Sequence, residues 1–204
     1  MEGLIEEMES LIRLPAIEGD SSRTQSFLAA FEQIVANGSK GNARWKAQCW
    51  ATQYCWLLVL DPVSLHAALW DPVARDRVNL LRLAKALPKN CKCLLSHEKP
   101  TSHGCVVLVV DLDLPILWYC RVSHHNWYTH EYSFEKHPGF QIQSVAAVHG
   151  DFYFSVSPIE LVCMELMCYE FAPEPRFTTI EHGKIWLAGG FPLEKAPQHL
   201  VESR

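Results

Sequence analysis

Residues that could bind a metal are concentrated between positions 91 and 103. Cys91 and Cys93 are separated by one residue, and His97 and His103 follow soon after. Two thiolates and two imidazoles are a ligand set suited to a tetrahedral zinc ion. However, residues two apart in a strand share one face, and Leu94-Leu95 continue an apolar strand.

This spacing favours Cys91 and Cys93 as core residues and the two histidines, His97 and His103, as solvated side chains of a polar loop. We therefore expect no metal ligand and no bound cofactor in this chain. The alternative, from a different functional class, is a small metal- or ligand-binding β-domain that uses the Cys91/Cys93/His97/His103 loop.

A second group of histidines, His124, His125 and His130, flanks Trp127 and Tyr128. Such a group could sense pH or bind a metal. Because these histidines follow directly after an apolar run, we interpret them as residues of a solvated hairpin turn.

Asp111-x-Asp113 resembles the start of a calcium loop, but the Gly and the distal Glu that such a loop needs are missing from the sequence. We expect a strand end there. The sequence also contains no Gly-x-Ser-x-Gly elbow, no P-loop and no Gly-x-Gly-x-x-Gly pattern after a strand. We therefore expect no catalytic residue and predict that the chain is not an enzyme.

The composition is that of an ordinary globular protein, with 204 residues, 49% of them hydrophobic and 20% charged. A net charge of −5 gives no basic field for nucleic acid or an anionic membrane. Apolar runs such as Cys105–Val110 are far shorter than the roughly 20 residues that cross a bilayer. The acidic N-terminus is unlike a secretory signal, so we expect the 8 cysteines to be reduced thiols in a cytoplasmic or nuclear protein.

Residues 1–42 are predicted to form a helical N-terminal segment and a linker. Apolar residues recur at helical spacing from Leu4 to Ile12, until Pro15 interrupts the pattern. A second helical stripe runs from Phe27 to Val35, with a serine cap at its start and Gly38 near its end. Asn37–Asn42 is rich in Gly, Ser, Asn and Lys, which is typical of a linker.

Residues 43–204 show a different pattern, in which short Val-, Leu- and aromatic-rich runs alternate with turn residues. We predict strands near residues 47–52, 55–60, 66–71, 91–96, 104–110, 115–121, 126–132, 143–149, 151–156, 160–166, 168–172 and 184–188. Cys105–Val110 is apolar throughout, so both of its faces should be covered. After residue 45, only Arg77–Leu87 has the spacing of a helix.

So many short antiparallel strands indicate a sandwich, a barrel or a propeller. Trp50–Trp70 and Ala147–Leu166 are similar hairpin units, about two kelch-like blade lengths of ~45–50 residues apart. His149-Gly150 predicts a tight turn between two apolar runs, because Gly supplies a positive φ. The predicted fold is all-β: a partial kelch-like β-propeller of about three to four blades of antiparallel strands, preceded by the short helical segment.

A more specific signal comes from a series of segments: Tyr54–Pro62 and Leu69–Pro72, then Leu87-Pro88 and Cys91–Ser96, then Leu117–Arg121 with Trp127 and Tyr132, then Val145–Phe154. Their order and spacing over about residues 45–204 resemble the plant KIB-type F-box-associated β-propeller family, a domain of unknown function. The resemblance implies a non-enzymatic module whose propeller loops bind an unknown partner protein, as in the substrate receptor of an SCF ubiquitin ligase. No motif marks individual binding residues.

Three residues depart from the family pattern. Cys55 replaces a Gly and could alter its hairpin turn, whereas Asp71 and Asp151 replace Asn and Lys and suit turns. Leu200–Arg204 resembles the opening of a family strand that normally continues. We therefore expect a truncated propeller with unpaired strand edges.

An F-box is a helical motif that binds the Skp adaptor of the ligase. Leu14-Pro15 faintly resembles its start, but no Cys-x-x-Trp or Trp-Arg pair follows Phe31 at the expected distance. We expect binding to a Skp-type adaptor only if a cryptic F-box exists in residues 1–36. Otherwise the chain would be an adaptor-free or decoy module, or a degenerate family fragment without function.

Overall fold

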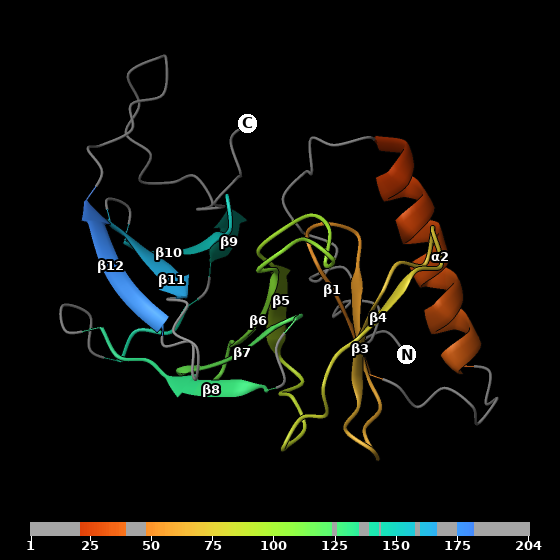
Figure 1. The fold of residues 1–204 in the computed structure, drawn as a ribbon, viewed down its shortest axis with the longest axis horizontal. Coiled ribbons are helices and arrows are strands. Elements are labelled where there is room, and N and C mark those ends of the chain that lie inside the picture. Colours follow the sequence, from red (N-terminus) through yellow and green to blue (C-terminus); the bar gives the residue numbers. More distant parts are fainter. Residues whose placement is uncertain are drawn as a thin grey trace.

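A computed structural model describes residues 21–39, 48–123, 126–134, 139–142, 144–157, 160–166 and 175–181 (Figure 1). These residues form one helix, α2 (Ser21–Ser39), and twelve strands. The helix confirms the second predicted helical stripe and extends into the expected linker. Several predictions lie outside the described residues: the helix at 4–12, Leu14-Pro15, His124, His125, Cys168, the strands at 168–172 and 184–188, and the chain end at 200–204.

The twelve strands form three four-stranded sheets, each built from four consecutive strands and antiparallel throughout. Blade 1 contains β1 (Gln48–Ala51), β2 (Leu57–Leu60), β3 (Ala67–Trp70) and β4 (Arg77–Asn79). Blade 2 contains β5 (Cys91–Leu95), β6 (Val106–Asp111), β7 (Ile116–Arg121) and β8 (Tyr128–Glu131). Blade 3 contains β9 (Val145–Val148), β10 (Asp151–Ser157), β11 (Glu160–Leu166) and β12 (Pro175–Glu181).

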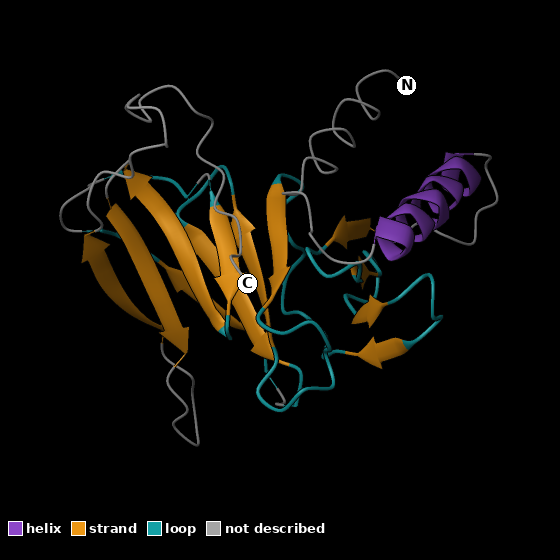
Figure 2. Cartoon of the chain, turned by 90° about the horizontal axis from the view of Figure 1, so that it is seen from above, coloured by secondary structure: helices purple, strands orange, loops and turns teal. Residues whose placement is uncertain are grey.

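The first strands of successive blades lie next to one another, since β1 contacts β5 and β5 contacts β9. The fourth strand of each sheet is therefore on the outside. Figure 2 shows the sheets in succession, with α2 at the blade 1 end of the series. These are three consecutive blades of a β-propeller, as the sequence predicted.

Blade 2 is buried on both faces. Along β6, Val107 and Val109 belong to the apolar core shared with blade 1, whereas Val106, Leu108 and Val110 belong to the core shared with blade 3. Side chains alternate across a strand, so a strand that is apolar at every position must have a neighbour on each side. This confirms the expectation for Cys105–Val110.

The helix considered for Arg77–Leu87 is wrong. This stretch begins with β4, and the chain then stays extended, with the Leu80 N–H bonded to the Ala67 carbonyl at 2.9 Å and the Leu83 N–H bonded to the Leu65 carbonyl at 2.9 Å. Leu80, Leu83 and Leu87 are buried in the core between blades 1 and 2, which accounts for their apolar character without a helix.

β12 was not predicted, because a partly exposed outer strand with Pro175, Arg176 and two threonines lacks an apolar run. Such polar outer strands are common where a sheet edge faces solvent.

Aspartates close three hairpin turns. In Asp61-Pro-Val63 and Asp71-Pro-Val73, the carboxylate accepts the N–H two residues later at 2.9 and 2.8 Å, respectively. Asp111 accepts the Asp113 N–H in the same way at 2.9 Å. Asp111-x-Asp113 is therefore the strand end that the sequence indicated.

Candidate protein-interaction face

The loops at one end of the three sheets include residues 52–56 between β1 and β2, 71–76 between β3 and β4, 96–105 between β5 and β6, and 149–150 between β9 and β10. They share this end because antiparallel strands reverse direction at every turn. Contacts across the blades join these four loops and the start of α2 to one another. We call this end of the molecule the bridged face.

Gln53 joins blade 1 to blade 2 at the bridged face. Its side-chain Nε2 donates to the Leu95 carbonyl at 2.6 Å, and its Oε1 accepts the Leu95 N–H at 3.1 Å. The Ser96 N–H donates to the Val106 carbonyl of β6. Because the backbone groups of successive strand residues point to opposite sides, the N–H and carbonyl of Leu95 face away from β6. The Gln53 amide thus pairs with the free edge of β5 as a backbone peptide would.

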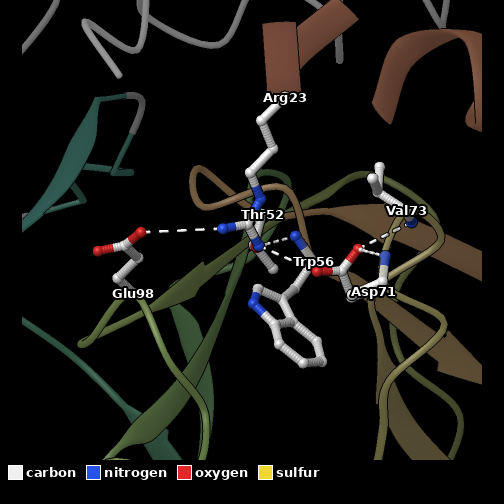
Figure 3. Close-up of polar contacts among 7 residues, drawn as sticks. Arg23, Thr52, Trp56, Asp71, Val73 and Glu98 are labelled. Atoms are coloured by element: carbon white, nitrogen blue, oxygen red, sulfur yellow. Dashed lines mark hydrogen bonds and ion pairs between the residues drawn. The ribbon is translucent and has the colours of Figure 1, made fainter. Parts of the chain in front are cut away.

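Arg23 of α2 reaches the same end of the molecule (Figure 3). Its guanidinium donates to Asp71 of blade 1 at 3.0 Å and lies 3.9 Å from Glu98 of blade 2. Asp71 is 3% exposed, and its other oxygen accepts the Val73 N–H. Because a buried carboxylate needs an opposite charge and full hydrogen bonding, this ion pair fixes α2 to blade 1.

Blades 2 and 3 meet at the bridged face through His97. An added Cβ on Gly150 would lie 3.4 Å from His97 Cε1, so the ring packs against the turn backbone. His97 Nδ1 is 2.7 Å from Ser96 Oγ, and this oxygen also accepts the Val106 N–H at 2.8 Å. With φ values of 52° and 100°, His149 and Gly150 form the predicted tight turn.

The exposed side chains of the bridged face are mixed in character. Val73 is 42% exposed at the tip of its turn, and its neighbours in the loops are charged or polar: Arg75, Asp76, Glu98, Lys99, Thr101, His103 and His149. The loops that carry them are joined by the contacts above, whereas these side chains face solvent. Such a surface is suited to binding another protein.

The residues of the predicted zinc alternative do not converge. Cys91 and Cys93 are buried in the core between blades 1 and 2, whereas His97 bonds to Ser96 and His103 is exposed. No group of three or more His, Cys, Asp or Glu residues in the described part of the chain is arranged to hold a metal ion.

Other predicted residues lie in the blades. The interpretation of His130 as a residue of a solvated hairpin turn is wrong: it lies on β8 and is half-buried, with its ring 5.4 Å from that of Phe177. Trp50, Trp56 and Trp118 are buried between blades 1 and 2.

Sequence reasoning did not find Gln53 or Arg23. Nothing in a turn glutamine or a helix arginine shows which distant backbone or carboxylate it will meet, so no sequence signal marks these two residues. Cys55, which replaces the family Gly, keeps a glycine-like φ of 60°, so the hairpin turn is retained.

Comparison with known proteins decides the family. The family model described as the KIB1-4 β-propeller matches residues 31–204. The chain belongs to the KIB1-4 β-propeller family. Propellers of this kind are usually non-catalytic interaction modules. No curated protein matches the chain. Within the described residues, no helix is long and apolar enough to span a membrane.

Replacing Gln53 with Glu should weaken the junction of blades 1 and 2, because a carboxylate cannot donate to the Leu95 carbonyl. We expect the free energy of unfolding at pH 7 to fall by about 1–3 kcal/mol, measured by urea denaturation. The carbonyl disfavours the charged form and so raises the folded-state pKa of the new carboxyl. The deficit should therefore shrink as the pH falls toward about 4.3, the ordinary Glu pKa, since the protonated carboxyl can donate again.

Gln141→Glu is the matched control, because Gln141 donates to the Asp113 carbonyl at 2.7 Å in an exposed setting. Gln141→Glu should lower the free energy of unfolding by less than Gln53→Glu does. Equal losses in the two variants would contradict the assigned role of Gln53.

The buried thiols should resist alkylation in the folded protein. Burial raises the pKa of Cys91 from 9.0 to about 12 and also raises the pKa of Cys93 and Cys120. Because the thiolate is the reactive form, iodoacetamide at pH 8 should label these cysteines roughly 100-fold more slowly than in denaturant. Peptide mapping by mass spectrometry measures the extent of labelling at each cysteine. Rapid native labelling of Cys93 or Cys120 would contradict the described core.

Proposed function

We propose that the chain is a protein-recognition module whose partner protein binds the bridged face. The observation that supports this most strongly is the pairing of Gln53 with Leu95, together with the Arg23 and His97 contacts, which fix loops of three blades relative to one another. A surface that is already ordered loses less conformational entropy when a partner binds.

Membership in the KIB1-4 family supports a finer proposal. The chain would act as a substrate receptor that presents a partner to an SCF-type ubiquitin ligase when an F-box is joined to it. We place this activity in the cytoplasm or nucleus. The exposed mixture of apolar and charged tips on the bridged face fits a partner surface with an apolar anchor and a polar rim.

Two Asp-Pro-Val turns provide a matched test of the binding face. Val73→Glu with Lys99→Glu alters the bridged face, whereas Val63→Glu with Lys89→Glu makes the same changes at the opposite end. A partner captured by the unaltered chain should bind the first variant at least about 10-fold more weakly and the second nearly unchanged, since charge reversal at an anchor costs more than about 1.4 kcal/mol. Titration calorimetry gives both affinities. Loss of binding only in the second variant would move the site to the other end.

Adaptor binding tests the ligase role. The chain alone should not retain a purified Skp-type adaptor in a pull-down, whereas a fusion with an F-box ahead of residue 1 should retain the adaptor and the bridged-face partner together. A fusion that holds the adaptor but not the partner would contradict the receptor role. Adaptor binding by the unaltered chain would reveal an F-box within residues 1–36.

A further inference from the structure

Blade 1 contains the same turn twice, in two different environments. Asp61–Val63 begins the turn between β2 and β3, and Asp71–Val73 begins the turn between β3 and β4. In both turns, one carboxylate oxygen accepts the N–H groups two and three residues later. Each turn also ends with a residue of positive φ, at 58° and 63° respectively. The two turns are therefore a matched pair within one chain.

The second carboxylate oxygen has a different partner in each turn. In Asp61 it accepts the Ser64 hydroxyl at 2.7 Å, and the aspartate is exposed. In Asp71 it accepts the Arg23 guanidinium of α2 at 3.0 Å, and the aspartate is buried. Because a buried carboxylate that lacks an opposite charge is strongly destabilised, the Asp71 turn depends on α2, whereas the Asp61 turn is completed by its own serine.

Helix α2 also contacts two neighbouring loops of the bridged face. Arg23 lies 3.9 Å from Glu98, in the loop between β5 and β6 (Figure 3). Cys55, in the loop between β1 and β2, has a φ of 60°, which is unfavourable for a residue with a Cβ. The Cys55 side chain is nevertheless buried against Phe27 and Phe31 of α2. One helix thus touches three loops of the bridged face.

We propose that Arg23 is a positioning residue of the bridged face, and that docking of α2 on blade 1 keeps the loop between β3 and β4 in its binding conformation. This inference rests on the proposed function of the face, because the exposed apolar tip, Val73, lies in that loop. While α2 is docked, the Asp71 carboxylate holds two backbone N–H groups in place. When α2 leaves blade 1, this carboxylate loses its opposite charge and the loop loses its order. A partner of the bridged face therefore binds the docked form more tightly.

Hydrogen exchange of single backbone amides, followed by NMR, tests the role of Arg23. Arg23→Gln should speed exchange of the Val73 and Ala74 N–H groups at least about 10-fold, because it leaves a buried charge uncompensated. Exchange of the Val63 and Ser64 N–H groups should stay nearly unchanged. Unchanged exchange at Val73 would show that its turn is independent of α2, and an equal rise in both turns would show a general loss of stability. Either result would overturn the proposal.

Two further variants separate the charge of Arg23 from the packing of its side chain. Arg23→Lys restores a cation and should recover most of the protection of the Val73 N–H. Arg23→Gln with Asp71→Asn removes both charges, and the Asn side-chain oxygen can still accept the Val73 N–H. Exchange at Val73 should therefore be slower than in Arg23→Gln alone. A double variant that exchanges as fast as Arg23→Gln, or faster, would contradict the coupling of the two charges.

Detaching α2 tests the second part of the proposal. Phe27→Glu with Phe31→Glu places two charges against the apolar face of blade 1 and should release the helix. Iodoacetamide labelling of Cys55, which α2 covers in the docked form, measures this release. Exchange at Val73 should then rise while exchange at Val63 does not. A Val73 N–H that keeps its protection after Cys55 has become reactive would refute the role of α2.

The matched control is Gln25→Glu with Ala29→Glu, which adds the same charge at exposed positions of α2. This control should change neither the labelling of Cys55 nor the exchange at Val73. No partner takes part in any of these measurements. They can therefore refute the role of α2 independently of the titrations that test whether a partner binds the bridged face.

Discussion

Burial of sheet faces is the constraint on which this molecule depends. Blades 1 and 2 each have two apolar faces, and neither face can be left in water without a large loss of stability. Blade 2 meets the requirement with blades on both sides. Blade 1 meets it with blade 2 on one side and α2 on the other. In the described part of the chain, each apolar face of blades 1 and 2 therefore has a neighbour.

Packing between faces is non-directional, so it does not by itself set how one blade is rotated against the next. Hydrogen bonds at the bridged face supply the direction. The Gln53 amide pairs with both backbone groups of Leu95, and its geometry is as exact as that of a strand pair. The His97 ring against Gly150 fixes the following junction. Core packing gives the blades their stability, and these few polar contacts give the loops their positions.

The sequence predicted the blades well because their strands are strongly apolar. The run at Cys105–Val110 is apolar at every position, a pattern that only a strand covered on both faces can have. The turn residues Asp61, Asp71 and Gly150 indicate hairpins by their local chemistry alone. It failed where local pattern and tertiary role differ. The stretch after Arg77 has helical leucine spacing, but its leucines lie in the core between blades 1 and 2 without forming a helix, and β12 is a polar outer strand. The roles of Arg23 and Gln53 could not be predicted from the sequence, because their partners Asp71 and Leu95 lie 48 and 42 positions away in the chain.

The two Asp-Pro-Val turns of blade 1 have a further consequence. In each, the aspartate fixes the backbone, and a residue with positive φ, Leu65 or Arg75, ends the turn. The valine between them contributes no bond through its side chain and projects into solvent, 84% exposed at Val63. The tip of such a turn can therefore change by single substitutions while the fold is preserved. A lineage of these proteins could in this way diverge in what it recognises without first evolving new architecture.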